Sequence, residues 1–195
     1  MTAQRDHEPH RLDPVERPDD ALLAVRAAEG DEEAFEELVR GHGSAMVHLA
    51  YRLLGDRTEA EDAVQDAFIS AWRKLPEFRG EAGFRTWLHR IVTNRCLNVL
   101  RARRPVTDID DVPEPVAPEH QSSPARAAES TAAVRALGQA MAGLSAEQRA
   151  CWVLREIEGM PYEAIAEVVG ITQEAVRARV FRARRCLTEA MGAWR

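Results

Sequence analysis

The chain has 195 residues, 45% of them hydrophobic and 30% charged, which fits one large globular domain or two small ones. It has no run of about 18 apolar residues, and the N-terminal stretch MTAQRDHEPHRLDPVERPDD has no apolar core, so the sequence predicts neither a membrane span nor a signal peptide. The three cysteines form no CxxC pair, which argues against a disulfide framework or a zinc site and favours a reducing, cytoplasmic location.

Charge is distributed unevenly along the chain. The 26 basic and 32 acidic side chains give a formal net charge of -6. Residues 29–66 carry eleven acids and three arginines, residues 79–104 carry one acid and seven arginines, and residues 105–130 carry six acids and one arginine. Five arginines then fall within residues 177–185. The two basic stretches predict anion-binding surfaces on a protein that is acidic overall.

Two helices are expected at the start of the first domain, after a disordered polar tail over residues 1–19. Asp19 or Asp20 can cap a short helix that Gly30 ends. Asp31 can cap the next helix. Apolar residues recur along this second helix at steps of three, four and seven: Phe35, Leu38, Val39, Met46, Leu49 and Leu53.

Two further helices complete this domain. Thr58 and Glu61 form a capping-box pattern at the start of one helix, and Pro76 ends it. After a loop that contains two glycines, another helix is expected from about Thr86 to Arg103. Because no segment alternates with the period of a strand, residues 20–104 are predicted to form an all-helical domain.

Residues 105–130 are predicted to be a flexible, extended, acidic linker. They contain five prolines, two adjacent serines and few side chains that a core could bury. At roughly 3.3–3.6 Å per residue they span about 90 Å at most, so the flanking domains can act at well-separated places. The helical pattern resumes in residues 131–195, predicted to be a second small helical domain, in which Ser145 and Gln148 form another capping box.

The end of the second domain has the pattern of a helix-turn-helix. A helix is expected over Tyr162–Val169, followed by a turn at Gly170 and a last helix capped by Thr172. Two helices joined by a short turn that contains glycine are typical of this motif. Gly170 suits the turn because glycine adopts the required positive φ without a steric penalty.

The last helix carries side chains suited to DNA. A recognition helix places its first residues against base edges in the major groove, which here are Thr172, Gln173, Glu174 and Arg177. Arginine suits guanine, glutamine suits adenine, and glutamate can accept from cytosine. Later residues on the same helix are Arg179, Phe181, Arg182, Arg184 and Arg185, whose guanidinium groups would meet phosphates. The alternative interpretation is a solvated basic helix that covers a small bundle.

A second candidate for nucleic-acid binding is the stretch FRGEAGFRTWLHRIVTNRCLNVLRARR. It interleaves Phe78, Phe84 and Trp87 with Arg79, Arg85, Arg90 and Arg95. Aromatic rings can stack on bases while arginines follow phosphates, a combination that suits single-stranded nucleic acid. The alternative is that Phe84 and Trp87 are core residues.

These motifs, in this order, resemble the extracytoplasmic-function (ECF) family of RNA polymerase sigma factors. The resemblance covers about residues 20–192 and rests on DAVQDAFISAWRKLPEFRG, FRTWLHRIVTNRCLNVLRARR, the acidic linker and LSAEQRACWVLREIEGMPYEAIAEVVGITQEAVRARVFRARRCL. It implies that residues 20–104 are sigma region 2, which binds core RNA polymerase and opens the minus-ten promoter element. It implies that residues 131–195 are sigma region 4, which binds the minus-thirty-five element as duplex.

The resemblance also implies partners and site residues. The partners are the largest and second-largest subunits of core RNA polymerase, promoter DNA and an anti-sigma factor, with no cofactor, metal or catalytic residue. The implied polymerase contacts are Asp62, Gln65, Asp66, Phe68 and Trp72. The implied minus-ten contacts are Phe78, Arg79, Phe84, Arg85, Thr86, Trp87, Arg90 and Asn94. The implied minus-thirty-five contacts are Thr172, Gln173, Glu174, Arg177, Arg179, Phe181, Arg182 and Arg184.

The alternatives to a sigma factor are a stand-alone DNA-binding regulator and an enzyme. A helix-turn-helix regulator that binds DNA alone would need a dimerisation or ligand domain, and the sequence offers none. An enzyme would need a catalytic set, but the six histidines form no HxxxH or triad-like pattern and no phosphate-binding glycine motif occurs. The acids Glu59, Glu61, Asp62 and Asp66 lack a histidine or a second carboxylate helix to complete a metal site.

Overall fold

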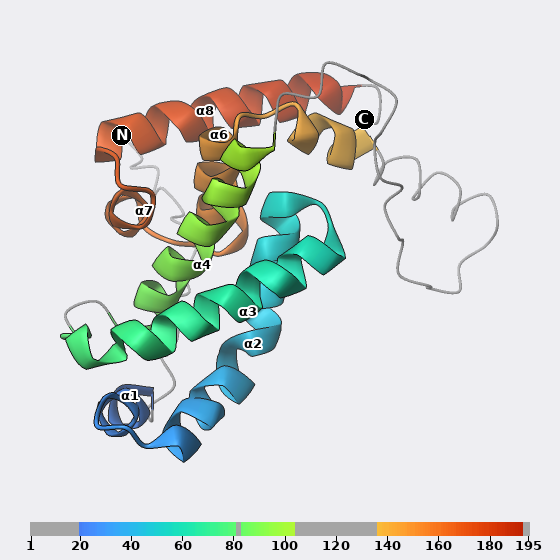
Figure 1. Ribbon diagram of the computed structural model, residues 1–195. Coiled ribbons are helices and arrows are strands. Elements are labelled where there is room, and N and C mark those ends of the chain that lie inside the picture. The colour runs from blue at the N-terminus through green and yellow to red at the C-terminus, as the bar shows by residue number, and fades with distance from the viewer. Residues whose placement is uncertain (1–19, 81–82, 104–135, 193–195) are drawn as a thin grey trace, which may run out of the picture.

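The described part of the protein is a bundle of helices joined by short turns (Figure 1). The computed structural model describes residues 20–80, 83–103 and 136–192, and none of these residues lies in a strand. The all-helical fold class predicted from the sequence is therefore confirmed over these ranges. The predicted disordered tail and the predicted linker lie outside the described residues.

The first half of the chain forms one layer of packed helices. Helices α2, α3 and α4 pack against one another, and α1 covers α2 and the short 3₁₀ turn η1. Their bounds are Asp20–Ala28 for α1, Glu32–Leu54 for α2, Arg57–Lys74 for α3, Leu75–Glu77 for η1 and Phe84–Ala102 for α4. The core of this layer includes Leu38, Met46, Leu49 and Leu53, all predicted to face inward and all fully buried.

Local signals set where these helices begin. The side chain of Asp31 caps α2 by accepting from the Ala34 amide at 3.0 Å, as predicted. The predicted cap of α3 at Thr58 is wrong, because Asp56 accepts from the Glu59 amide at 2.9 Å and the helix starts at Arg57. Gly55 at φ 77° turns the chain so that Asp56 is already extended and its carboxylate reaches that amide first.

The second half of the chain ends in the predicted helix-turn-helix. Residues 136–142 are helical. They are followed by α6 (Ala146–Trp152), the π-helical turn η2 (Val153–Ile157), α7 (Tyr162–Val169) and α8 (Gln173–Ala190). The capping box at α6 is confirmed, because the Ser145 amide donates to Gln148 Oε1 at 3.0 Å and the Gln148 amide donates to Ser145 Oγ at 3.2 Å.

The turn between α7 and α8 has the geometry that the sequence predicts. Gly170 adopts a left-handed φ of 74°. Thr172 Oγ1 accepts from the Ala175 amide at 3.2 Å, which caps α8. The inward face of α8 is a buried stripe at helical spacing: Val176, Val180, Ala183 and Leu187. The opposite face of α8 is therefore free to carry the arginines outward.

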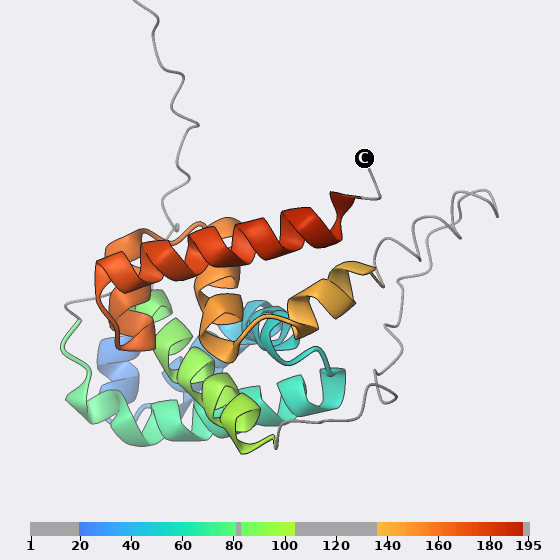
Figure 2. The same cartoon turned by 90° about the horizontal axis from the view of Figure 1, so that it is seen from above.

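The two halves of the chain pack directly on each other. Helix α4 contacts both α7 and α6, and α2 contacts α6 (Figures 1 and 2). One hydrophobic cluster runs through both halves and includes Leu88 and Val92 of α4 with Leu154 and Ile165 of the second half. This contact surface was not predicted from the sequence.

Candidate polymerase and nucleic-acid interfaces

The recognition helix α8 presents most of its predicted minus-thirty-five residues to solvent. Thr172, Glu174 and Arg177 are exposed at its start, and Gln173 is half-buried. Further along the helix, Arg182 and Arg184 are exposed and Arg179 is half-buried. Phe181 is 65% exposed, which is unusual for so large an apolar side chain. These side chains form a basic outer face with one apolar ring among the arginines.

Contacts within the second half restrain two of these arginines. Arg184 Nη2 donates to Glu156 Oε1 at 2.6 Å, so this guanidinium is already paired within the second half. Arg179 Nη1 reaches the carbonyl oxygen of Ala175 at 3.5 Å. Arg177 and Arg182 are both exposed. Those two guanidinium groups are therefore the best placed of the set to contact DNA.

The predicted minus-ten aromatics form a cluster at the start of α4. The ring centroids of Phe78 and Trp87 are 5.0 Å apart, and those of Phe84 and Trp87 are 5.7 Å apart. Phe84 is only 2% exposed and also contacts His42, which pairs with Asp20 in a buried hydrogen bond of 2.9 Å. This burial favours the core alternative for Phe84. Phe78 and Trp87 are half-buried and keep part of each ring accessible.

The polar minus-ten candidates fall into two groups. Arg79, Arg90 and Asn94 are exposed, and the last two are four residues apart on one face of α4. Arg85 and Thr86 are half-buried. Arg85 lies on the side of α4 that contacts the second half. The structure thus places Arg79, Arg90 and Asn94 toward solvent and Arg85 at the contact between the halves.

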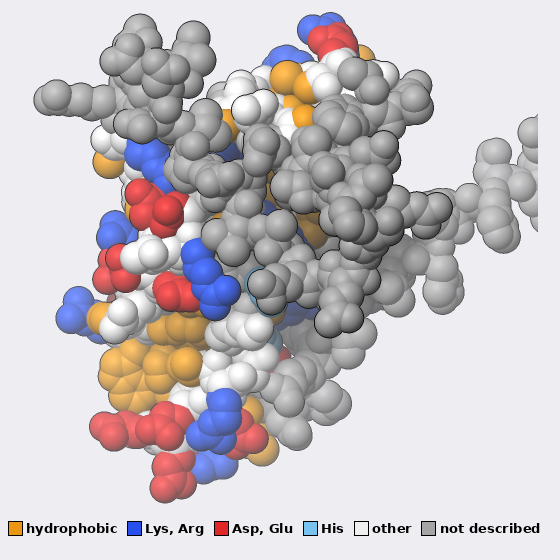
Figure 3. Space-filling view, turned by 90° about the vertical axis from the view of Figure 1, so that its right-hand side faces the viewer, with side chains coloured by type: hydrophobic (Ala, Val, Ile, Leu, Met, Phe, Trp, Pro, Cys, Tyr) orange, Lys and Arg blue, Asp and Glu red, His pale blue; other side chains and the backbone are white. Residues whose placement is uncertain are grey.

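Three of the predicted polymerase-binding residues, Gln65, Phe68 and Trp72, line an apolar groove between α2 and α3. Asp62, Gln65 and Asp66 are exposed, whereas Phe68 is buried and Trp72 is half-buried. The groove has a volume of about 590 Å³. Its apolar lining is Phe35, Val39, Val47, Val64, Phe68, Ile69 and Trp72, and its acids are Glu32, Glu36 and Glu61. Figure 3 shows a hydrophobic patch with acidic side chains around it on this side of the molecule.

The sequence did not distinguish the wall of this groove from the core. Phe35 and Val39 were predicted to face inward, yet both are half-buried and line the groove. The rings of Phe35 and Trp72 lie 4.9 Å apart and form one wall. Ile69 is 46% exposed. An apolar residue on the outer face of an acidic helix is the sequence feature that could have indicated an apolar surface here.

A largely buried carboxylate, that of Glu158, joins the two halves. Glu158 Oε1 accepts from Arg52 Nη1 at 2.8 Å, while Oε2 lies 3.6 Å from His89 Nε2 and 3.7 Å from Arg85 Nη2. Glu158 is only 10% exposed. The contact with His89, aided by the positive charges of Arg52 and Arg85, holds the pKa of Glu158 below its ordinary value.

Two further contacts join the halves. Arg149 is buried, and its Nη1 donates to the carbonyl oxygen of Leu53 at 2.8 Å. Burial lowers the pKa of this guanidinium from its ordinary value. At the surface, Arg101 Nη2 donates to Glu147 Oε1 at 3.1 Å. These contacts could not be predicted from local sequence patterns, because the partners are 96 and 46 residues apart in the chain.

Other features of the described residues bear on possible chemistry. Burial raises the pKa of Cys96 to about 12 and that of Cys151 to about 11, whereas Cys186 is exposed. Among the described residues, no group of three or more His, Cys, Asp or Glu side chains is arranged to hold a metal ion. No helix within the described ranges is both long enough and apolar enough to span a membrane.

Two family models match the chain. Residues 38–106 match sigma-70 region 2, and residues 134–187 match sigma-70 region 4. The first match includes α3, α4 and most of α2, and the second includes the helix-turn-helix.

Known proteins are similar over most of the chain. The RNA polymerase sigma-H factor of Pseudomonas aeruginosa is 37% identical over 88% of this chain and 93% of its own length. The ECF RNA polymerase sigma factor SigM of Mycobacterium tuberculosis is 37% identical over 91% of this chain and 86% of its own length.

Two solved structures are also similar to this chain over most of its length. The structure of CnrH in complex with the cytosolic domain of CnrY has a TM-score of 0.66 and 32% identity, and covers 89% of this chain and 97% of that one. The sigma factor RpoE from Bartonella quintana, solved in complex with the anti-sigma factor NepR, has a TM-score of 0.62 and 28% identity, over 83% of this chain and 98% of that one. The chain belongs to the ECF family of RNA polymerase sigma factors.

Proposed function

We propose that this protein is an alternative sigma factor that binds core RNA polymerase and directs promoter-specific initiation of transcription. The observation that carries the proposal is that each family match coincides with a surface of fitting chemistry. The region 2 match contains most of the lining of the apolar groove beside α3, from Val39 to Trp72, and the region 4 match contains the basic face of α8. In this role the protein has no catalytic residue and acts in the cytoplasm, where core polymerase works.

The groove between α2 and α3 is the proposed polymerase surface. Its lining is mostly apolar, which suits the side chains of a partner helix, and Ile69 adds an exposed apolar side chain to that lining. The exposed acids Asp62 and Asp66 would pair with basic residues of the polymerase at the rim. Asp66 also pairs with Arg95 of α4 at 2.5 Å. The same carboxylate would therefore contact the polymerase and hold α4 against α3.

DNA binding is assigned to two separate surfaces. Trp87 and Phe78, with Arg79, Arg90 and Asn94, would take the melted minus-ten strand, because partly exposed rings beside exposed cations suit unpaired bases. The start of α8 would enter the major groove at the minus-thirty-five element. An anti-sigma factor is the further expected partner, because the similar structures of CnrH and RpoE were solved with CnrY and with the anti-sigma factor NepR.

Run-off transcription tests the proposal. The full chain and a bacterial core RNA polymerase are combined with a library of promoters, and transcripts that start at defined sites only when the chain is present are expected. A stand-alone regulator would instead shift promoter DNA in a gel without polymerase and would program no transcript. The proposal fails if no promoter in the library is transcribed while the chain remains folded by circular dichroism.

A pair of matched variants tests the groove. Ile69→Asp puts a charge on an exposed apolar residue that lines the groove, and Leu22→Asp makes the same change on α1, where Leu22 is 62% exposed. The Ile69 variant should bind core polymerase at least tenfold more weakly, and the Leu22 variant should bind like the unmodified protein. Equal binding by both variants would remove the groove from the polymerase surface.

A further inference from the structure

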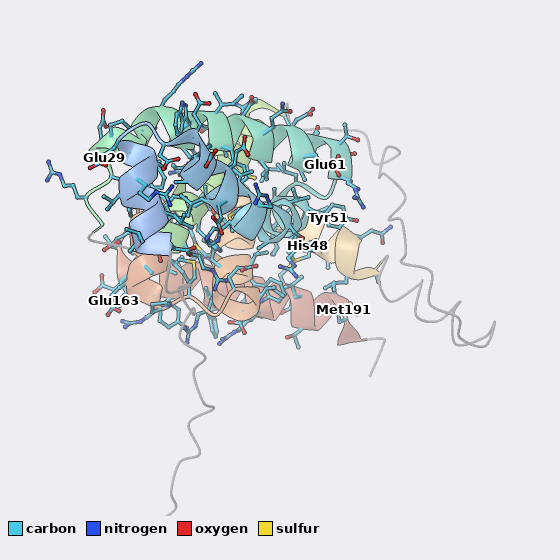
Figure 4. All side chains as sticks on the ribbon, turned by 90° about the horizontal axis from the view of Figure 1, so that it is seen from below. Glu29, His48, Tyr51, Glu61, Glu163 and Met191 are labelled. Carbon is cyan, nitrogen blue, oxygen red and sulfur yellow. The ribbon has the colours of Figure 1, made fainter. Side chains whose placement is uncertain are left out.

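The start of α7 contacts both side chains of α8 that are best suited to read bases. Gln173 Nε2 donates to Glu163 Oε1 at 2.9 Å. The guanidinium carbon of Arg177 lies 5.4 Å from the ring centroid of Tyr162. Figure 4 shows Glu163 at the end of the molecule where α8 begins, with Met191 marking the far end of that helix. Two adjacent residues of the first helix thus meet two reading residues of the second.

We propose that Glu163 determines base specificity by orienting the amide of Gln173, and that Tyr162 acts in the same way on Arg177. The inference deepens the proposed function, because it rests on α8 being the helix that reads the minus-thirty-five element. Neither residue needs to touch a base. Each limits the orientations from which a reading side chain approaches the DNA.

The chemistry of the Gln173 contact selects one orientation of its amide. A carboxylate can only accept hydrogen bonds, so Glu163 binds the nitrogen end of the amide and not the oxygen end. One N–H of Gln173 is then used, which leaves the other N–H and the carbonyl oxygen for DNA. Adenine presents an N7 acceptor beside an N6 donor, and these two groups match that remaining pair. The geometry therefore favours adenine at the position that Gln173 faces.

Tyr162 is itself held in place. The guanidinium carbon of Arg155 lies 4.4 Å from the same ring centroid, and Arg155 Nη1 donates to the carbonyl oxygen of Met160 at 2.9 Å. A planar guanidinium stacked near an aromatic ring loses much of its rotational freedom. The Arg177 side chain is exposed, and among the described residues its contact with the Tyr162 ring is what restrains the direction of its guanidinium.

The charge of Glu163 gives the inference a distinctive signature. Glu163 is exposed beside a helix that approaches DNA, so its carboxylate repels phosphates and lowers affinity for every sequence. Glu163→Gln removes that repulsion and also lets residue 163 accept or donate, so the Gln173 amide can turn round. Affinity should therefore rise while preference at one base position falls. A residue with a purely structural role would lower affinity and leave the preferred sequence unchanged.

Glu167 supplies a matched control. It is an exposed glutamate one turn further along α7, and Glu167→Gln removes the same charge from the same helix. The assay uses the full chain with core polymerase and promoters randomised at the minus-thirty-five element. Total affinity and the base preference at each position are measured at one fixed salt concentration.

The expected results separate the two variants. Both variants should bind DNA more tightly than the unmodified chain, because each loses a carboxylate that repels phosphates. Only Glu163→Gln should reduce the base preference at a single position, by about fivefold or more. Gln173→Ala should relax that same position, and adding Glu163→Gln to it should relax it no further, because the two residues act as one unit.

Two results would overturn the inference. The first is an unchanged base preference in Glu163→Gln, and the second is the same relaxation in Glu167→Gln. A folding defect is recognised by circular dichroism, and Glu163→Ala then serves as a second variant at the position. Failure of the proposed function is a separate outcome, because the unmodified chain would then select no minus-thirty-five sequence at all.

Discussion

Glu158→Gln should loosen the contact between the two halves of the protein. In the unmodified protein, Glu158 Oε1 accepts from Arg52 Nη1 at 2.8 Å, and the glutamine keeps the size of the side chain and an oxygen that can accept this bond. The substitution removes the negative charge that faces Arg52, Arg85 and His89. A hydrogen bond to a charged group contributes about 1.5–3 kcal/mol and a neutral one about 0.5–1.5 kcal/mol. Because the Arg52 side chain is 42% exposed, solvent screens part of the difference, which leaves about 1 kcal/mol.

A distance measurement between the halves tests this prediction. Dyes are attached at Cys186 on α8 and at a cysteine introduced by Thr58→Cys on α3, since both positions are exposed. Cys96 and Cys151 should react slowly because burial raises the pKa of each thiol to about 12 and about 11, and the thiolate is the reactive form. A free-energy change of about 1 kcal/mol should raise the ratio of separated to closed molecules about fivefold.

The control is Glu61→Gln, which removes a carboxylate that pairs with Arg57 on the same helix and has no ion pair across the halves among the described residues. The same distance distribution in the Glu158 variant, the Glu61 variant and the unmodified chain would refute the reasoning. The contact should also depend on pH. Since the folded pKa of Glu158 lies below its ordinary value of 4.5, its stabilising effect is complete above that value and is lost as pH falls through the lowered pKa. The Glu158→Gln protein should lack that acid-dependent step.

Three further predictions address other residues. Arg149→Ala should lower the free energy of unfolding by about 1–3 kcal/mol in a urea titration, because the buried Leu53 carbonyl loses its donor at 2.8 Å; an unchanged midpoint would contradict this. Arg177→Ala should lower the binding free energy for promoter DNA by about 1–3 kcal/mol and reduce the base preference at one position. Arg182→Ala should weaken binding to all promoters alike and reduce the slope of log affinity against log salt concentration by about one, and promoter titrations measure both effects. Trp87→Ala should impair opening of duplex promoters in permanganate footprinting while pre-melted templates restore transcription, and normal opening by a folded variant would rule out this role.

The helix-turn-helix was predictable from sequence because its signals are local. The bounds of α7, the left-handed Gly170 and the Thr172 cap all depend on residues within one or two turns of one another, and all are confirmed. The start of α3 was misplaced because two capping residues, Asp56 and Thr58, compete, and the conformation of Gly55 decides between them.

The contact between the halves has no local signal. Arg52 and Glu158 are 106 residues apart, and neither stands out from other surface charges in the sequence. The predicted linker further favoured an interpretation with two separate domains. The groove was missed for a different reason. Periodicity places Phe35 and Val39 on an apolar face, but it does not show whether another helix covers that face or leaves it open.

Arg85 connects the contact between the halves with DNA binding. Its guanidinium lies 3.7 Å from Glu158 Oε2, yet the family resemblance assigns the same residue to the minus-ten element. The Glu158 carboxylate offsets part of the positive charge of Arg85 and draws its guanidinium toward the second half, so the closed contact weakens the attraction of Arg85 for the melted strand. When only a fraction of molecules is competent to bind, the apparent affinity falls by that fraction. Glu158→Gln should therefore bind pre-melted promoter DNA up to about fivefold more tightly. When Arg85 is already replaced by alanine, Glu158→Gln should increase the affinity for this DNA by a smaller factor, because the guanidinium that Glu158 restrains is absent. Equal gains in both backgrounds, measured by fluorescence anisotropy, would show that Glu158 acts on DNA binding without Arg85.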